Sequence, residues 1–298
     1  MAIVQVESTT IDIFNQEGLE FLKTIKSESV DLVLTDPPYI TSRVTGMGLW
    51  AEHVEKQDKA GSADAKTEKQ WLEFVYNPER DWGLFFENSD VVDKLKRCDK
   101  MHRDYIKYGS IYGKKYAVTT DYGDWDSQFT LEIMAQFVSE FYRVLRKGGT
   151  AIVFFDIWKL TNLRNMLEES KFKQLRFIEW IKTNPQPLNS SRNYLTNCRE
   201  IALSAVKGGS PTFNSKYDNA IYKFPIQSGK SRFHPTQKSL PLFEALVEKH
   251  SSPGDLILDP FLGAGTTASA AKNTNRSFIG TEIDEDFFNK TLDRIKKT

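Results

Sequence analysis

Short apolar runs alternate along the chain with segments whose apolar residues recur at helical spacing. The run at 30–35 (VDLVLT) is rich in β-branched residues and stops at two prolines, which predicts a buried parallel strand ending in a loop. Residues 130–145 instead place side chains such as Leu131, Met134 and Phe137 on one face of a helix. The same patterns predict strands at 11–14, 150–155, 177–182, 201–206, 255–259 and 277–283, and helices at 18–25, 160–170, 240–250 and 286–297, with a glycine loop that runs into a helix at 263–273.

Strands that alternate with helices predict an α/β fold on one doubly wound, mostly parallel sheet. Residues 41 to about 128 interrupt this order, because they are polar and rich in Tyr and Trp and show no sustained period. Only 67–75 and 91–108 within them are partly helical in pattern. We therefore expect a single domain over 1–298 with an inserted arm at 41–124.

Composition narrows the class of protein. A chain of 298 residues with 40% hydrophobic and 27% charged residues is typical of a globular protein, and no apolar run approaches the roughly 20 residues that span a bilayer. The N-terminus lacks the features of a secretory signal, and two cysteines make neither a disulfide framework nor a four-cysteine zinc site. We expect a cytoplasmic protein with no membrane partner and no bound metal.

Charge is balanced overall but unevenly distributed. The chain has 40 basic and 40 acidic residues, yet 93–116 hold eight basic and three acidic side chains, and 182–238 hold nine basic and two acidic ones. Such segments are either solvated faces or sites for a polyanion. Charge alone does not separate these two interpretations.

A glycine turn joins the strand at 255–259 to the next helix. Gly263 and Gly265 allow a tight turn and close approach of a ligand, but the loop is neither a phosphate loop nor the triple-glycine loop of dinucleotide enzymes. Glu282, at the end of the following strand, can accept hydrogen bonds from ribose hydroxyls. A ribose-bearing cofactor with a carboxylate and no pyrophosphate fits this pattern, and S-adenosylmethionine is such a cofactor. The alternative is an ordinary tight turn.

A second candidate site, Asp36-Pro37-Pro38-Tyr39, follows the strand at 30–35, where open α/β sheets bind ligands. Asp36 and a Pro37 carbonyl can accept the two hydrogens of an exocyclic amino group, which turns its lone pair toward a methyl donor. Tyr39 can stack on the ring that carries the amino group. An isolated Asp-Pro-Pro would more simply be a capped turn, but the strand, the tyrosine and the glycine loop favour a catalytic site.

Together these motifs resemble a known family. DPPY at 36–39 and DPFLGAGTT at 259–267 are similar to the catalytic and cofactor motifs of the DNA amino-methyltransferases, which methylate adenine N6 or cytosine N4. The catalytic motif comes first here, which is the mark of the circularly permuted β class. The segments 234–238 (HPTQK) and 15–20 (NQEGLE) also resemble that class, although Glu17 stands where the family usually has Asp.

The resemblance implies the fold of S-adenosylmethionine-dependent methyltransferases, with that cofactor and double-stranded DNA as substrates. A flipped base would be methylated by direct displacement, with no covalent enzyme intermediate. The implied catalytic residues are Asp36, Pro37, Pro38 and Tyr39. The implied cofactor residues are Glu17, His234, Thr236, Gln237, Lys238, Asp259, Pro260, Phe261, Gly263, Gly265, Thr266, Thr267 and Glu282.

Target choice in the family comes from a variable recognition region. The candidates here are 186–233 and the insertion 41–124, in which basic and aromatic side chains are interleaved. The insertion could serve a homodimer instead, and a cognate restriction endonuclease is a further possible partner. The expected DNA contacts are Lys107, Lys114, Lys115, Arg192, Arg199, Lys230 and Arg232.

Several alternatives remain open at the level of sequence. Cytosine N4 is the second choice of target, because Ser more often than Asp opens the motif of cytosine enzymes in the family. An RNA amino-methyltransferase uses the same chemistry, whereas protein-glutamine enzymes typically have NPPY after the cofactor loop. A catalytically idle DNA-binding subunit is disfavoured by intact Asp36, Tyr39, Gly263 and Gly265.

Overall fold

The computed structural model describes residues 2–6, 9–38, 66–76, 91–108, 129–185, 197–227, 232–234 and 236–297. The chain divides into two compact units, one made of 1–40 and 124–298 and the other of 41–123. In the part of the chain that the structure describes, no helix is both long and apolar enough to cross a membrane.

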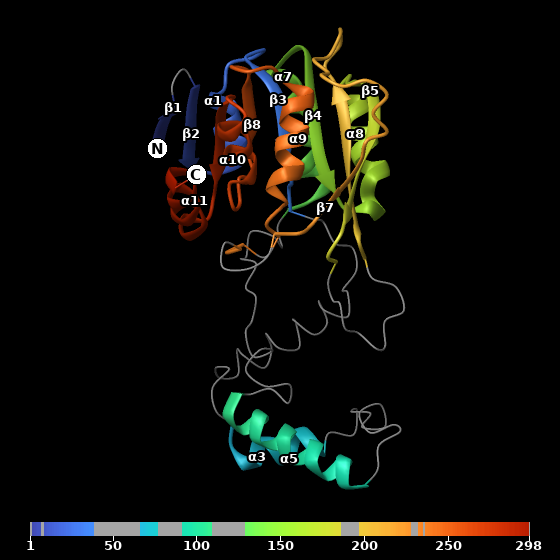
Figure 1. The fold of residues 1–298 in the computed structure, drawn as a ribbon, viewed down its shortest axis with the longest axis vertical. Helices are drawn as coiled ribbons and strands as arrows, with labels where there is room; N and C mark the ends of the chain where they lie inside the picture. Colours follow the sequence, from blue (N-terminus) through green and yellow to red (C-terminus); the bar gives the residue numbers. More distant parts are fainter. Residues whose placement is uncertain are drawn as a thin grey trace. The chain divides into compact units, whose positions relative to one another are not determined.

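A twisted sheet forms the centre of the larger unit (Figure 1). Its nine described strands have the order β1-β2-β9-β8-β3-β4-β6-β5-β7. Only β1 and β6 run antiparallel to their neighbours, so the other seven strands share one direction. The strands are β1 (Ala2–Val6), β2 (Thr9–Asn15), β3 (Val30–Thr35), β4 (Leu145–Phe155), β5 (Lys173–Lys182), β6 (Arg199–Val206), β7 (Ile221–Phe224), β8 (Leu256–Asp259) and β9 (Ser277–Glu282).

Helices cover both faces of this sheet, as a doubly wound fold requires. Helices α9, α10 and α11 contribute to the apolar core on one face, and α1, α7 and α8 to the core on the other. A short 3-10 helix, η2 (Ile157–Lys159), follows β4. The helices are α1 (Gly18–Thr24), α7 (Leu131–Val144), α8 (Leu160–Glu169), α9 (Leu240–His250), α10 (Thr266–Asn273) and α11 (Glu285–Lys297).

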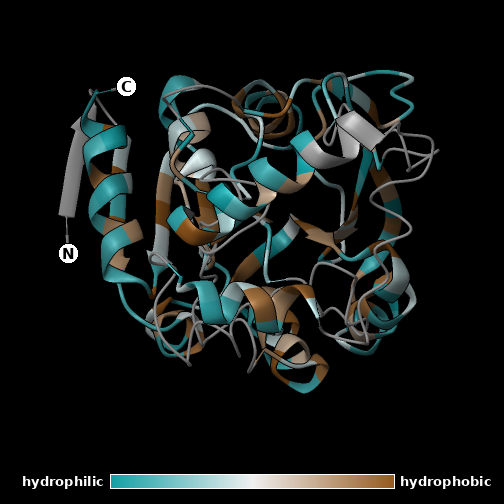
Figure 2. Cartoon of the chain, turned by 90° about the horizontal axis from the view of Figure 1, so that it is seen from below, coloured by the Kyte–Doolittle hydropathy of each residue, from teal (hydrophilic) through white to brown (hydrophobic). Residues whose placement is uncertain are grey.

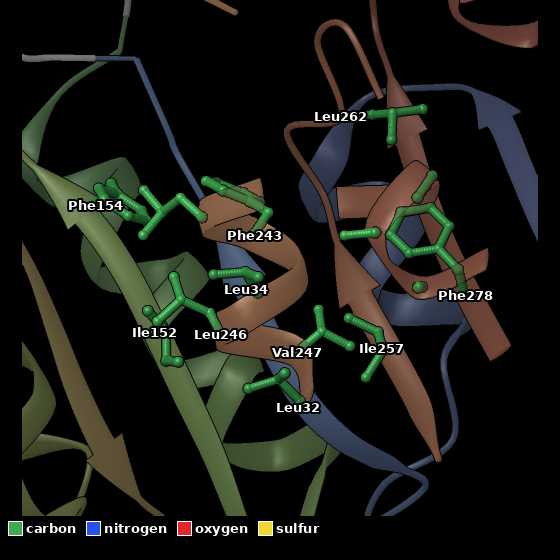
Figure 3. Close-up of a cluster of buried hydrophobic side chains, with 14 of the residues drawn as sticks. Leu32, Leu34, Ile152, Phe154, Phe243, Leu246, Val247, Ile257, Leu262 and Phe278 are labelled. Atoms are coloured by element: carbon green, nitrogen blue, oxygen red, sulfur yellow. The ribbon is translucent and has the colours of Figure 1, made fainter. Parts of the chain in front are cut away.

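The core under α9 fixes the start of that helix against the sheet (Figure 3). Leu34 of β3 and Phe154 of β4 point toward Phe243 and Leu246 of α9, and all four are buried. The rings of Phe154 and Phe243 stack with centroids 5.5 Å apart. This packing holds the segment before α9 close to the carboxyl ends of β3 and β4.

Most predicted elements are found near their expected bounds, and the differences have physical reasons. The sequence analysis did not predict β1 and β7 at the two edges of the sheet, since strands of five and four residues are too short to show a clear period. Helix α10 begins at Thr266, directly after the two glycines of the turn, as the glycine loop at 263–273 predicts. In Figure 2, α11 is mostly hydrophilic, and its buried residues are Phe288, Thr291 and Ile295.

The described part of the smaller unit is a pair of helices, α3 (Glu68–Val75) and α5 (Val91–Tyr108). Thr67 caps α3 by accepting a hydrogen bond from the N–H of Gln70, in a reciprocal capping box. Tyr105 packs against Phe74, with ring centroids 4.6 Å apart. This contact joins the two helices at an aromatic cluster.

Candidate active site

Four neighbouring parallel strands end at one edge of the sheet, and each carries an acidic residue there. Asp36 directly follows β3, Asp259 and Glu282 are the last residues of β8 and β9, and Glu17 lies two residues beyond β2. The order β2-β9-β8-β3 makes these strands neighbours. Two motifs that are far apart in the chain are therefore adjacent in the fold, as expected at the ligand-binding edge of an open α/β sheet.

The carboxylate of Asp36 lies beside a lysine. Its side chain is 17% exposed, and its Oδ2 atom is 2.6 Å from Nζ of Lys238. Its Oδ1 atom is buried and has no hydrogen-bond partner in the described part of the chain. Burial raises the pKa of Asp36 to about 6, although the charge of Lys238 opposes the shift. A buried acceptor without a donor is uncommon in native proteins, so this oxygen is suited to a donor that a ligand brings.

Lys238 also contacts a second carboxylate. Its Nζ atom is 2.8 Å from Oε2 of Glu200, and Oε1 of Glu200 is 2.6 Å from Nζ of Lys182. Burial disfavours the charged form of Glu200, but the two lysines outweigh it and lower the pKa of Glu200 to about 2. Burial likewise disfavours charged Lys238, yet Asp36 and Glu200 raise its pKa. The four side chains form a buried chain of alternating charge.

Glu282 fixes the glycine loop. Gly263 and Gly265 have φ values of +51° and +70°, which glycine adopts without strain. The N–H of Gly263 donates to Oε2 of Glu282 at 2.7 Å, and the N–H of Asp284 donates to Oε1 at 3.0 Å. Glu282 is 6% exposed, and burial raises its pKa to about 7. This carboxylate is therefore about half ionised near neutral pH and responds to any donor placed beside it.

Asp259 connects the two motifs through hydrogen bonds. The hydroxyl of Thr35 donates to its Oδ1 atom at 2.6 Å, and the hydroxyl of Thr267 donates to its Oδ2 atom at 2.6 Å. The N–H of Phe261 also donates to Oδ1, at 3.0 Å. Burial raises the pKa of Asp259, which is only 3% exposed. Its structural role is to join the end of β3 to the start of α10.

Comparison with known proteins identifies the family. Residues 30–293 match the N6_N4_Mtase family, which is described as DNA methylase. The chain belongs to this DNA methylase family. It is 31% identical to the type II methyltransferase M2.DpnII of Streptococcus pneumoniae over 200 residues, 60% of this chain and 74% of that protein. It is 27% identical to the type II methyltransferase M.HpaI of Haemophilus parainfluenzae over 231 residues, 70% of this chain and 72% of that protein.

Solved structures share the fold of this methylase. The complex of M1.HpyAVI with SAM has a TM-score of 0.56 and 22% identity, covering 95% of this chain and 99% of that chain. The PvuII DNA methyltransferase, which is cytosine-N4-specific, has a TM-score of 0.59 and 15% identity, covering 95% of this chain and 85% of that chain. The predicted fold class and DNA methyltransferase family are confirmed.

In the methylase, the two ends of the segment 234–238, which was expected at the cofactor, lie at different motifs. His234 packs edge-on against Phe287, with ring centroids 4.4 Å apart, and a Cβ atom at Gly263 would lie 3.8 Å from its ring. Burial lowers the pKa of His234 to about 4, so the ring is neutral, and its Nδ1 atom accepts from the N–H of Thr236 at 3.3 Å. Lys238, four residues later, contacts Asp36 of the other motif.

Other residues of the expected cofactor site make contacts within the protein that stabilise their own loops. Oε1 of Gln237 accepts a hydrogen bond from the N–H of Phe233 at 3.2 Å. Phe261 packs against Phe137, with ring centroids 4.5 Å apart. Glu17 caps α1. The buried members of the set include Pro260, Thr266 and Thr267. Their contact with a cofactor remains a prediction.

The predicted DNA contacts are only partly described. Arg199 begins β6 and pairs with Glu179 at 3.2 Å, and Nε of Arg232 donates to the carbonyl of His234 at 3.4 Å. Lys107 lies on α5, in the smaller unit. Tyr39, Lys114, Lys115, Arg192 and Lys230 lie outside the described residues. Within the described ranges, no group of three or more His, Cys, Asp or Glu side chains could hold a metal ion.

Sequence analysis missed Glu200 and Lys182, the two members of the charge chain that lie beyond Lys238. Lys182 ends β5 and Glu200 is the second residue of β6, so the antiparallel pairing of these strands brings them to the same edge as Asp36. A signal was present, since a lysine ends one predicted strand and a glutamate precedes the next. The expected run of parallel strands gave no reason to pair them.

Proposed function

We propose that this methylase transfers the methyl group of S-adenosylmethionine to the exocyclic N6 amino group of adenine in a short motif of double-stranded DNA. The observation that carries the proposal is the buried Oδ1 atom of Asp36, which has no hydrogen-bond partner among the described residues and follows the strand next to the one that leads into the glycine loop. An amino group is a hydrogen-bond donor of the kind that this oxygen lacks.

The residues around the glycine loop fit S-adenosylmethionine. Glu282 ends β9 and Glu17 lies just beyond the adjacent β2, so their carboxylates can receive the ribose hydroxyls and the cationic groups of this cofactor. Gly263 and Gly265 carry no side chains, so a cofactor can approach the backbone of this turn closely. When bound, the cofactor supplies an electrophilic methyl group on a sulfonium ion. The proposal that His234 and Thr236 line its edge rests on their place beside Gly263.

The proposed role of Asp36 is to orient the adenine amino nitrogen, which is the nucleophile. The lone pair of an adenine amino nitrogen is conjugated with the ring, so the nitrogen attacks poorly while it stays planar. Asp36 accepts one amino hydrogen and the Pro37 carbonyl the other, which turns the lone pair out of the ring plane. Tyr39 stacks on the base, which has been flipped out of the duplex. The proton leaves after the attack, so positioning supplies most of the catalysis.

Adenine is favoured over cytosine by one residue. The fold does not choose the base, because a cytosine-N4-specific enzyme shares it. Asp36 opens the motif, and in this family Asp is more typical of adenine enzymes. Cytosine N4 is therefore the second candidate.

The proposed partners are inferred from basic side chains of this protein and from the names of similar proteins. Arg199, Arg232 and Lys107 are basic side chains suited to phosphate contact, and we assign DNA contact or dimerisation to 41–124 and target recognition to 186–233. Two similar proteins are named type II methyltransferases. These names support a restriction–modification role with a cognate endonuclease in the cytoplasm of a bacterial or phage-infected cell.

Base-resolved sequencing tests the proposed function. The protein is expressed in a host without DNA methylation of its own, with an Asp36→Ala variant as the matched control. We expect N6-methyladenine at one short recurring motif with the wild type and none with the variant. Methylation at cytosine N4 would overturn the choice of base. An absence of modified DNA from soluble protein that binds S-adenosylmethionine would overturn the choice of DNA as substrate.

A further inference from the structure

We propose that Lys238, Glu200 and Lys182 form a positioning network that fixes the carboxylate of Asp36 for the amino group of the target base. This inference rests on the proposed function, in which Asp36 contacts that amino group. It assigns to Lys238 a role at the catalytic motif, although the sequence placed it at the cofactor.

The sheet brings the members of the network to one face and one edge. Side chains alternate between the faces of a strand, so Asp36 follows Leu32 and Leu34 on the face that α9 covers. Phe154 of β4 lies on the same face, and Nζ of Lys238 is 5.8 Å from the centroid of its ring. Lys238 stands two residues before α9, whose start is held by the core in Figure 3. The ammonium therefore has little freedom to leave Asp36.

The contacts assign different tasks to the two oxygens of Asp36. Nζ of Lys238 contacts Oδ2 at 2.6 Å, while Oδ1 is buried and has no partner in the ranges that the structure describes. Nζ of Lys238 contacts Glu200 on its other side, at 2.8 Å, and Glu200 is held in turn by Lys182. One oxygen is thus anchored to the protein, and the other remains for a ligand.

A structural role alone does not account for this arrangement. The four side chains are between 8% and 18% exposed, and charged groups are costly to bury. Apolar residues in place of a buried ion pair often stabilise a protein at least as well. Within the described part of the chain, the network also ends on a carboxylate oxygen without a partner rather than on a closed pair. These features suit a group that is held ready for a substrate.

The network also sets the charge state of Asp36. In the described structure, the charged groups that act on it are Lys238 before α9, Glu200 on β6 and Asp259 at the end of β8. Lys238 favours the ionised form, and the two carboxylates oppose it. Removing the charge of Lys238 therefore raises the pKa of Asp36, whereas removing the charge of Glu200 lowers it. The two substitutions are predicted to act in opposite directions.

The experiment measures single-turnover methylation against pH, with saturating DNA and S-adenosylmethionine, for Lys238→Met and Glu200→Gln. We expect Lys238→Met to slow the reaction roughly 100-fold at pH 7 and to move the acid limb of the profile to higher pH. Glu200→Gln moves the same limb to lower pH. Lys238→Arg, which keeps the charge, restores part of the rate. The affinity for S-adenosylmethionine, measured by calorimetry, stays within about threefold in all three.

Lys249→Met is the matched control, because Lys249 lies in the last turn of α9 and pairs with Asp218, away from the network. It leaves the rate and the pH profile unchanged. Acid limbs that move in the same direction in both variants, or a Lys238→Met enzyme with wild-type rate and profile, would overturn the network. Either result leaves the proposed function standing if the wild type methylates adenine. A wild type that methylates no DNA overturns the proposed function itself.

Discussion

The N–H of Gly263 donates a hydrogen bond of 2.7 Å to Oε2 of Glu282, so the carboxylate expected at the cofactor ribose also shapes the glycine loop. Glu282 is 6% exposed and lies at the end of β9, beside the strand that leads into the loop. In the proposed function, cofactor and loop therefore share one carboxylate. Any change in the charge of Glu282 acts on both.

This shared carboxylate predicts that binding of S-adenosylmethionine depends on pH. Burial raises the pKa of Glu282 to about 7, so the free enzyme loses the carboxylate form as the pH falls below 7. Ribose hydroxyls donate more strongly to a carboxylate than to an acid, so the affinity rises with pH up to about 7 and then levels off. Below pH 7 the dissociation constant increases by up to about tenfold per pH unit.

Calorimetry at pH 6.5 in buffers of different ionisation enthalpy measures the proton that Glu282 releases on binding. Glu282→Gln removes both the release and the pH dependence. Glu285→Gln, an exposed acid in the first turn of α11, retains both. A wild type that releases no proton would show that the cofactor does not contact an ionising Glu282.

Asp36→Asn separates catalysis from cofactor binding. The amide keeps the size of the carboxylate but removes the charge that pairs with Lys238. We expect methylation to slow by at least about 100-fold, because the amino group loses its charged acceptor, while the affinity for S-adenosylmethionine stays within about threefold. Single-turnover assays and calorimetry measure the two effects.

Asp31→Asn is the control for that substitution. Asp31 is the second residue of β3, at the opposite end of the strand, where it pairs with Arg146 and accepts a hydrogen bond from the N–H of Leu256 at 2.8 Å. Its substitution lowers stability and leaves the rate unchanged. A near wild-type rate in Asp36→Asn would remove Asp36 from the catalytic site.

The strongest sequence signals came from motifs that combine a strand with residues of special backbone chemistry. The strand at 30–35 and its Asp-Pro-Pro ending were predicted as found, since β-branched residues and prolines act locally. Gly263 and Gly265 likewise marked the turn before α10, which their positive φ values require. Such local constraints are visible in sequence.

Pairs of charged residues that are far apart in the chain could not be predicted from the sequence. Nothing in the residues around Lys238 indicates that it reaches Asp36 rather than the glycine loop, because that choice depends on where α9 packs. The partnership of Glu200 with Lys182 depends on the antiparallel insertion of β6 between β4 and β5. Sequence thus located the edge of the sheet that carries the site, and topology decided which charges meet there.

The two threonines that hold Asp259 predict a stability effect of their own. Thr35→Val and Thr267→Val each remove one hydroxyl donor from a buried carboxylate, so each lowers the free energy of unfolding by about 1–3 kcal/mol. Thr183→Val, at an exposed position after β5, is the control and changes it little. Urea denaturation measures all three. Equal effects at the three sites would show that Asp259 does not depend on these donors.

Substitution of Gly265 is predicted to lower stability for two reasons that can be measured separately. A Cβ atom at Gly265 would lie 2.5 Å from Cγ2 of Thr291, and its φ of +70° is unfavourable for any other residue. Gly265→Ala therefore suffers both a clash and backbone strain. Gly263→Ala suffers only the strain, about 1–2 kcal/mol, because its φ is +51° and its nearest contact is 3.8 Å away.

Thermal denaturation without cofactor separates these costs. Gly265→Ala is expected to lower the melting temperature more than Gly263→Ala does. Thr291→Ser removes Cγ2 but keeps the hydroxyl that donates to the carbonyl of Gly263 at 2.7 Å. Adding it to Gly265→Ala should therefore recover the part of the loss that comes from the clash and leave the part that comes from strain. Full recovery in the double variant would mean that the left-handed backbone at Gly265 carries no cost, and no recovery would mean that Thr291 is not the obstacle.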